Sequence, residues 1–230
     1  MQFIIKTLLT KKKRCLMNSP QTIADLFSLP IELVDLLLEH GSIQKVNSGD
    51  LLGEKGSDPK RLALILDGVF AVDNVDYDGV NRLVGLLGPG SSIFENPIIM
   101  SYKVSTVVES LTQSTVLLIP IAFAKQLLNT NLEFNQFLLR QQASKTLYFA
   151  QILYWSHEKE MDRKIHLMLT LLSDTVRSRS LPLSNEQLAS ILGMSRNSVS
   201  KALKTLESSG AIRLDKGMIS LQKEMREPLK

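Results

Sequence analysis

A stretch of about 25 residues without glycine or proline, from Leu132 to about Trp155, constrains the fold of this chain more than any other feature. At a rise of about 1.5 Å per residue it predicts a helix about 37 Å long, which is longer than a small domain needs. Thr130 and Glu133 have the spacing of a capping box, so we expect this helix to begin at Thr130. The chain is therefore expected to be built around one long helix.

Residues at alternating four- and three-residue steps along this helix form a heptad seam with small side chains in its middle. The seam runs through Leu132, Gln136, Leu139, Ala143, Thr146, Ala150, Leu153 and His157. A second apolar stripe contains Phe134, Phe137, Leu138, Phe149 and Ile152. Two apolar sides favour packing against a partner helix as well as against the rest of the chain, although an ordinary buried helix is the alternative. The residues predicted to contact a second copy are Leu139, Ala143, Thr146, Ala150 and Leu153.

Residues 41–120 consist of short Val, Ile and Leu runs separated by turn signals. Asp67-Gly68, Asp78-Gly79 and Gly88-Pro89-Gly90 are such signals, and they recur about every ten residues. This spacing is typical of short antiparallel strands in a sandwich or a barrel. Residues 20–40 are expected to precede the strands as a short helical lead-in that stops at Gly41.

Residues 184–208 have the pattern of two short helices joined by a tight turn. Ser184 and Ser195 stand at the two predicted helix starts, where a hydroxyl can accept a hydrogen bond from a free backbone N–H. Gly193 supplies the positive φ that the turn requires. Residues 210–214 and 217–221 are expected to follow as a hairpin. The segment therefore predicts a helix-turn-helix with a wing.

The exposed face of the second helix is rich in residues that can bind DNA. The side chains predicted to contact base edges are Arg196, Asn197, Ser200, Lys201 and Lys204. The hydroxyls that suit phosphate contacts are those of Ser195, Ser198, Thr205 and Ser208, and Ser184 completes the predicted set. A solvated polar face is the alternative, but the combination of two helices, a glycine turn and a wing favours DNA binding.

Charge is unevenly distributed along the chain. Residues 156–230 contain 13 Lys/Arg and 9 Asp/Glu, whereas residues 15–155 contain 9 Lys/Arg and 14 Asp/Glu. An acidic middle joined to a basic C-terminal part suits a sensor attached to a unit that binds a polyanion.

Composition also excludes or disfavours several classes of protein. Cys15 is the only cysteine, which excludes an intrachain disulfide and a cysteine-only metal or iron–sulfur site. No apolar run approaches the roughly 18 residues that span a bilayer, so we expect a cytoplasmic protein without a membrane partner. The sequence has no phosphate-binding glycine loop and no catalytic constellation. An enzyme with a helical tail is therefore the disfavoured alternative, and no metal or cofactor is expected.

The order of β domain, long helix and winged helix-turn-helix resembles the Crp/Fnr family of bacterial regulators, which includes the cyclic-AMP receptor protein and the fumarate–nitrate reduction regulator. The resemblance covers about residues 20–222 and is strongest over residues 183–203. It is weaker in Ile65-Leu66-Asp67-Gly68-Val69 and in Leu87-Gly88-Pro89-Gly90. It implies a homodimer that holds an effector between the β domain and the long helix, binds double-stranded DNA and works with RNA polymerase.

The fold class that this resemblance implies is α+β. An N-terminal antiparallel β-roll, a jelly-roll of the cyclic-nucleotide-binding type, is followed by a central dimerisation helix and a C-terminal winged helix-turn-helix. The expected domain boundaries are residues 18–128, 129–157 and 158–230.

The chain departs from the family's pattern where cyclic AMP would bind. Family members that bind it have Gly-Glu and Arg-Ser pairs, which correspond here to Phe94-Glu95 and to about Val104-Ser105. The adenine-facing hydroxyls of the family fall near Phe149-Ala150. A cyclic phosphate needs a close backbone amide and a fixed cation, so we expect an effector other than cyclic AMP.

An apolar pocket with a few polar groups is the expected effector site. Its predicted residues are Phe94, Glu95, Tyr102, Lys103, Ser105, Tyr148 and Phe149. These side chains suit a small aromatic or organic-acid ligand, and plain core packing in a constitutive regulator is the alternative. A haem sensor is a further alternative, but His157 and His166 are expected at a hinge and on a helix surface.

Base preference can be predicted from the second helix of the motif. The family commonly has Glu where this chain has Asn197, and Arg where it has Lys201. The Asn197 amide offers one donor and one acceptor, which match the N7 and N6 edge of adenine. We therefore expect an A·T-rich palindrome whose half-sites lie about 34 Å apart.

Met17 is expected to be the natural start of the chain, because the basic leader Lys11–Arg14 precedes the family-like region. Deletion of residues 1–16 should then leave folding and operator binding largely intact. A leader that acts as a basic DNA-contacting arm is the alternative.

Overall fold

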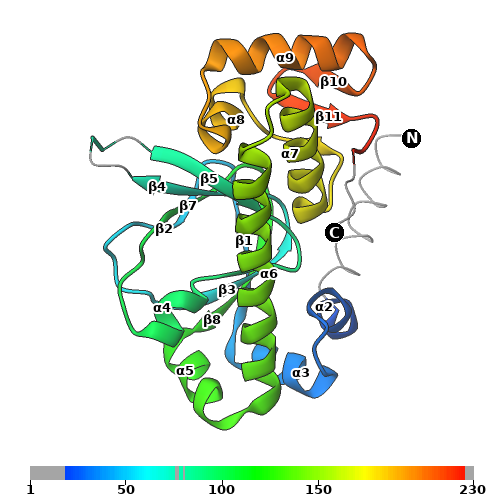
Figure 1. Ribbon diagram of the computed structural model, residues 1–230. Coiled ribbons are helices and arrows are strands. Elements are labelled where there is room, and N and C mark those ends of the chain that lie inside the picture. Colours follow the sequence, from blue (N-terminus) through cyan, green and yellow to red (C-terminus); the bar gives the residue numbers. More distant parts are fainter. Residues whose placement is uncertain (1–18, 76–77, 80, 226–230) are drawn as a thin grey trace.

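The computed structural model describes residues 19–75, 78–79 and 81–225. A β-roll forms the lower part of the molecule, the long helix α6 crosses its front, and the C-terminal domain lies above it (Figure 1). The predicted fold class is therefore confirmed. Cys15, Met17 and the basic leader lie outside the described residues.

The β-roll is made of two four-stranded antiparallel sheets, with strand orders β1-β8-β3-β6 and β2-β7-β4-β5. Their bounds are β1 Ser42–Val46, β2 Leu51–Gly53, β3 Arg61–Asp67, β4 Phe70–Val75, β5 Asn81–Leu87, β6 Ser92–Ile93, β7 Val107–Ser110 and β8 Ser114–Pro120. A short helix, α4 (Glu95–Met100), connects β6 toward β7. Strand β3 is buried on both faces: Ala63 and Ile65 belong to the apolar cluster between the sheets, whereas Leu62 and Leu64 pack against helices. This double burial explains its nearly continuous apolar sequence.

The predicted helical lead-in over residues 20–40 consists of two helices, α2 (Pro20–Phe27) and α3 (Ile31–His40). Ser28 ends α2 in the left-handed region, with φ of 52°. Pro30 disfavours helical backbone at the residue before it, so the helix cannot continue. Gly41 does follow α3, as predicted, but its φ is −101° and the stop needs no left-handed glycine.

The N-cap of helix α6 (Leu132–Ser156) lies one residue later than the capping-box pattern predicts. Thr130 is the last residue of α5 (Ile121–Thr130), and its hydroxyl donates to the carbonyl of Gln126 at 2.9 Å. Asn131 caps α6 instead, because its side-chain oxygen accepts from the N–H of Phe134 at 2.8 Å. The buried residues of α6 lie in two clusters. Phe134, Phe137 and Leu138 pack with α2, α3, α5 and the roll, and Tyr148 and Trp155 belong to the cluster that the roll shares with the C-terminal domain.

The C-terminal domain has the predicted winged helix-turn-helix order. Its elements are α7 (Met161–Val176), β9 (Ser180–Leu181), α8 (Asn185–Leu192), α9 (Arg196–Ser208), β10 (Ile212–Asp215) and β11 (Met218–Leu221). Strands β10, β11 and β9 form one antiparallel sheet, so the predicted hairpin is confirmed and gains a third strand. The predicted surface position of His166 is wrong: its side chain is buried, and Nε2 donates to the carbonyl of Lys223 at 2.7 Å.

The roll and the C-terminal domain share one apolar core. Leu83 and Leu86 of β5 belong to the same buried cluster as Leu188 and Leu192 of α8. The Ser190 hydroxyl of α8 donates to the carbonyl of Leu83 at 3.3 Å, and Figure 1 places α8 beside the β4–β5 hairpin. The first helix of the motif is therefore attached to the roll, while α9 lies at the far end of the molecule. In the described part of the chain, no helix is long and apolar enough to cross a membrane.

Candidate DNA-binding surface and effector pocket

Local capping positions the two helices of the motif. The Ser184 hydroxyl accepts from the N–H of Gln187 at 3.1 Å, and the Gln187 side chain accepts from the N–H of Ser184 at 2.9 Å. Gly193 then ends α8 with a φ of 62°, a left-handed conformation that glycine adopts without a steric penalty. The Ser195 hydroxyl caps α9 by accepting from the N–H of Ser198 at 3.1 Å. The sequence of the segment thus sets the angle at which α9 leaves the turn.

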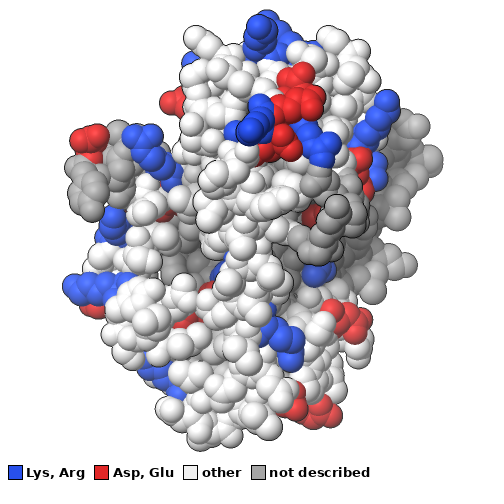
Figure 2. Space-filling view, viewed as in Figure 1, with Lys and Arg blue, Asp and Glu red and all other residues white. Residues whose placement is uncertain are grey.

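Helix α9 separates a buried apolar face from an exposed polar face. Val199, Ala202, Leu203 and Leu206 are buried. Arg196, Asn197, Lys201 and Lys204 are exposed, and Ser198 and Ser200 are half-buried. Figure 2 shows Lys and Arg side chains at the upper end of the molecule, where α9 lies in Figure 1. These exposed cations and the Asn197 amide form a surface that can enter a major groove.

Several predicted phosphate-contacting hydroxyls form hydrogen bonds within their own helix. The Thr205 hydroxyl donates to the carbonyl of Lys201 at 3.3 Å, and that of Ser208 donates to the carbonyl of Lys204 at 2.8 Å. Ser184 and Ser195 are N-caps. The structure therefore gives these residues a structural role, to which a contact with DNA would be an addition.

A pair of substitutions separates capping from DNA contact at Ser195. We expect Ser195→Ala to lower the free energy of unfolding by about 1 kcal/mol, because the Ser198 N–H loses its acceptor. Ser195→Asp should restore stability, since aspartate also caps a helix, but should weaken DNA binding through repulsion of a phosphate. Urea unfolding and operator affinity measure the two effects. An unchanged urea midpoint in Ser195→Ala would contradict the capping role.

The side of α6 that faces away from the roll is exposed and apolar. Leu132, Leu139 and Leu153 of the predicted seam are 70%, 71% and 63% exposed, and Ala143, Thr146 and Ala150 lie on the same exposed side. Figure 2 shows a largely uncharged surface down the middle of the molecule along this helix.

Sequence analysis missed two residues of this surface, Leu147 and Tyr154, each 66% exposed. Both follow a seam position by one residue. A straight helix has 3.6 residues per turn, whereas a strict seven-residue repeat assumes 3.5. The exposed side of α6 therefore rotates gradually away from the predicted seam, and this rotation brings Leu147 and Tyr154 onto the exposed surface.

A cavity of about 140 Å³ lies between the roll and α6, where the effector pocket is predicted. Of the predicted residues, it is lined by Phe94, Glu95, Ser105, Tyr148 and Phe149. Tyr102 and Lys103 are exposed and do not line it. They follow α4, and Ser101 turns the chain there with a φ of 54°.

Lys145 of α6 is the charged lining residue that sequence analysis missed. Its ammonium group forms an ion pair with Glu95 and donates to the carbonyl of Ser92 at 2.7 Å. Glu95 is buried, with 1% exposure, so this pair joins the helix to the roll inside the protein. Gln141, one turn earlier on α6, strengthens the connection: it accepts from the N–H of Ser92 and donates to the carbonyl of Gly90, both at 3.0 Å.

Tyr148 makes a further connection between α6 and the roll. Its hydroxyl accepts from the N–H of Leu86 at 2.9 Å. Burial raises the pKa of this hydroxyl more than the hydrogen bond from Leu86 lowers it, so the group stays protonated at neutral pH.

Phe94 adopts the left-handed conformation, with φ of 75°, at the position where the family's nucleotide binders have glycine. Its ring packs on Gly53, where an added Cβ would lie 2.5 Å from the ring. Val104 is also buried beside the cavity. If Phe94 and Val104 correspond to the family's Gly-Glu and Arg-Ser pairs as predicted, an aromatic ring and an aliphatic side chain stand where those pairs supply a close backbone amide and a cation.

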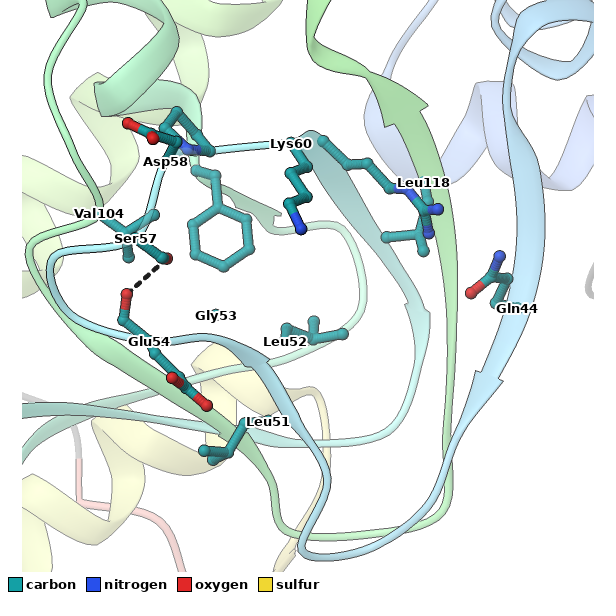
Figure 3. A pocket seen from close by; sticks show the side chains of 13 residues that line it. Gln44, Leu51, Leu52, Gly53, Glu54, Ser57, Asp58, Lys60, Val104 and Leu118 are labelled. Carbon is teal, nitrogen blue, oxygen red and sulfur yellow. Dashed lines mark hydrogen bonds between the residues drawn. The ribbon is translucent and has the colours of Figure 1, made fainter.

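A second hollow, of about 560 Å³, shares Phe94 and Val104 with this cavity as lining residues, and Figure 3 shows it from close by. It is lined by charges of both signs, including Glu54, Asp58 and Lys60, and the Ser57 hydroxyl donates to the carbonyl of Glu54 at 2.6 Å. Its charged residues are exposed, so it lacks the buried polar groups of the smaller cavity.

Two family models match the chain in the order of its domains. The model of a cyclic nucleotide-binding domain matches residues 43–131, and that of a Crp-like helix-turn-helix domain matches residues 162–226. No curated protein sequence matches the chain.

Solved structures share the fold at low sequence identity. The c-di-GMP-responsive global regulator CLP of Xanthomonas campestris is 17% identical, with a TM-score of 0.69 over 84% of this chain and 100% of that one. A putative Crp/Fnr transcriptional regulator of Eubacterium rectale is 16% identical, with a TM-score of 0.65 over 85% and 92%. FixK2 of Bradyrhizobium japonicum is 14% identical, with a TM-score of 0.66 over 80% and 93%.

A β-roll followed by a long helix and a helix-turn-helix domain defines a DNA-binding transcription regulator. The two matching family models agree with this architecture. The chain belongs to the Crp/Fnr family.

Proposed function

We propose that this protein is a homodimeric, cytoplasmic transcription regulator without enzymatic activity, which binds an A·T-rich palindromic operator and acts on RNA polymerase. The exposed face of α9 carries the proposal: Arg196, Asn197, Lys201 and Lys204 project from a helix that is capped at its start and packed along its other side. Asn197 is proposed to contact adenine, and Lys204 to contact a phosphate.

Dimerisation through α6 supports operator binding, because two copies of α9 are needed for two half-sites. Five large apolar side chains of α6 are more than 60% exposed. An exposed apolar surface of this kind is typical of a protein–protein interface. Association of two α6 helices would cover them around Ala143 and Ala150, where small side chains allow close approach.

An effector other than cyclic AMP is proposed to occupy the cavity beside α6. Phe94 and Val104 support this part of the proposal, because neither can bind a cyclic phosphate. We expect calorimetry with millimolar cyclic AMP to give no heat beyond dilution. A dissociation constant in the micromolar range would overturn the argument.

A constitutive regulator is the second candidate, and the ion pair between Lys145 and Glu95 favours it. This pair holds α6 on the roll without any ligand. Operator affinity that does not respond to any ligand of the cavity would support this candidate. A haem sensor is less favoured, since His166 is hydrogen-bonded to the carbonyl of Lys223 and His157 is the C-cap of α6.

A randomised-operator selection tests the proposed DNA contacts. We expect Asn197→Glu to shift one position in each half-site toward a G·C pair by roughly 1–3 kcal/mol, because a carboxylate accepts from the cytosine amino group. Lys204→Ala is the matched control. It should lower the affinity for all operator sequences alike and lower the slope of affinity against salt. If Asn197→Glu selects the same motif as the wild type, Asn197 does not contact a base.

A further inference from the structure

We propose that the cavity between the roll and α6 binds a neutral molecule of about the size of one aromatic ring, whose O–H or N–H group donates to Glu95. The inference rests on the proposed function and names the chemical class of its effector. Its three supports are the size of the cavity, an unpaired buried oxygen and the balance of charge in the lining.

The size of the cavity favours a small ligand. Its volume is about 140 Å³, and an apolar cavity of about 150 Å³ admits benzene. The walls are mostly aliphatic and aromatic: Val72, Leu86, Ile93, Pro97, Val108 and Phe149. A nucleotide, with its base, sugar and phosphate, is much larger than this space. A single-ring molecule matches the volume of the cavity.

An unpaired carboxylate oxygen specifies the polar group of the ligand. Oε1 of Glu95 is bound by Lys145, but Oε2 is buried and has no hydrogen-bond partner within the described ranges of the chain. A buried acceptor without a donor destabilises the protein by about 1–3 kcal/mol, or more when it is charged. Because a carboxylate only accepts, the group that satisfies Oε2 must be an O–H or an N–H. The ligand is therefore a hydrogen-bond donor.

The charges of the lining specify a neutral ligand. Among the described lining residues Lys145 is the only cation, and Glu95 already neutralises it. An organic acid, which the sequence left open, would place a second carboxylate beside Glu95 with no cation to compensate it, and such burial is strongly unfavourable. The protonated hydroxyl of Tyr148 adds a neutral donor to the lining. A phenol, alcohol or neutral amine fits this environment better than an anion.

Isothermal calorimetry of the full chain with phenol, toluene and benzoate tests the proposal. Phenol should bind at one site per chain. Toluene, which matches its size but lacks the donor, should bind at least about ten-fold more weakly. Benzoate should give no binding. The inference would be overturned if toluene bound as tightly as phenol, or if benzoate bound as tightly as phenol or more tightly. It would also be overturned if phenol did not bind at millimolar concentration.

Glu95→Gln should invert this preference. The substitution removes the negative charge that pairs with Lys145 and gives the side chain a donor of its own. The affinity for phenol should fall about ten-fold, whereas benzoate should now bind to the freed ammonium group of Lys145. Glu39→Gln, at the exposed end of α3, is the matched control and should leave both affinities unchanged. If Glu95→Gln does not fold, the order of the three ligands on the wild-type chain decides.

Operator affinity is measured on the same preparation, both without ligand and with phenol. Operator binding without phenol binding refutes the ligand class and leaves the proposed function intact. Phenol binding without operator binding in either condition refutes the proposed function and leaves the chemistry of the cavity established.

Discussion

The double substitution Ala143→Glu and Ala150→Glu is expected to convert the proposed dimer into a monomer and to weaken operator binding by about 10²–10⁴-fold. Both residues lie in the exposed apolar surface of α6, between Leu139 and Leu153. In a dimer each would meet its counterpart at close range, so four carboxylates would be buried together without a cation. A monomer has a single α9 and binds only one half-site at a time, which removes the gain from two linked contacts.

Analytical ultracentrifugation and operator titration measure the two effects. The matched control is Ala122→Glu with Gln126→Glu, two exposed positions four residues apart on α5. It adds the same charge to another helix surface and should leave both the dimer and the operator affinity unchanged. Should the α6 variant sediment as an intact dimer, another surface joins the two copies.

The winged helix-turn-helix was predictable almost to the residue because its signals are local. Ser184, Gly193 and Ser195 each act on backbone groups within three or four residues, so their spacing alone sets the two helices and the turn. The fold class followed from similarly local signals, namely the turn glycines of the roll and the uninterrupted stretch of α6. The domain boundaries and the DNA contacts remain predictions.

The effector pocket was only partly predictable because it depends on contacts between distant segments. Lys145 and Glu95 are 50 residues apart, and nothing near either residue indicates that they pair. Tyr102 and Lys103 are close in sequence to Glu95, but the turn at Ser101 leaves them in solvent. His166 shows the same limitation, since a segment 57 residues away covers it. In each case three-dimensional packing, rather than local propensity, decides the environment.

Gly88→Ala is expected to disrupt the junction between the roll and the C-terminal domain. The sequence marks Gly88 as a turn residue, but the structure gives it another reason: a Cβ there would lie 2.4 Å from the Cα and 3.0 Å from the carbonyl carbon of Val176. Both are backbone atoms at the end of α7, so no side-chain rotation relieves the clash and one domain must move. We expect a loss of about 1–3 kcal/mol in the free energy of unfolding.

Displacement of the junction should also affect operator binding, because the positions of the two α9 helices in a dimer depend on how each C-terminal domain packs on its roll. Scanning calorimetry should show one melting transition in the wild type and two in Gly88→Ala, as the shared core around Leu83 and Leu192 loosens. Operator affinity should fall together with this separation. Gly49→Ala is the control: its Cβ meets no atom within 4 Å, so only the left-handed backbone at φ +91° opposes it. That variant should lose about 1 kcal/mol and keep a single transition and its operator affinity. A single transition at the wild-type temperature in Gly88→Ala would mean that the contact with Val176 does not hold the two domains together.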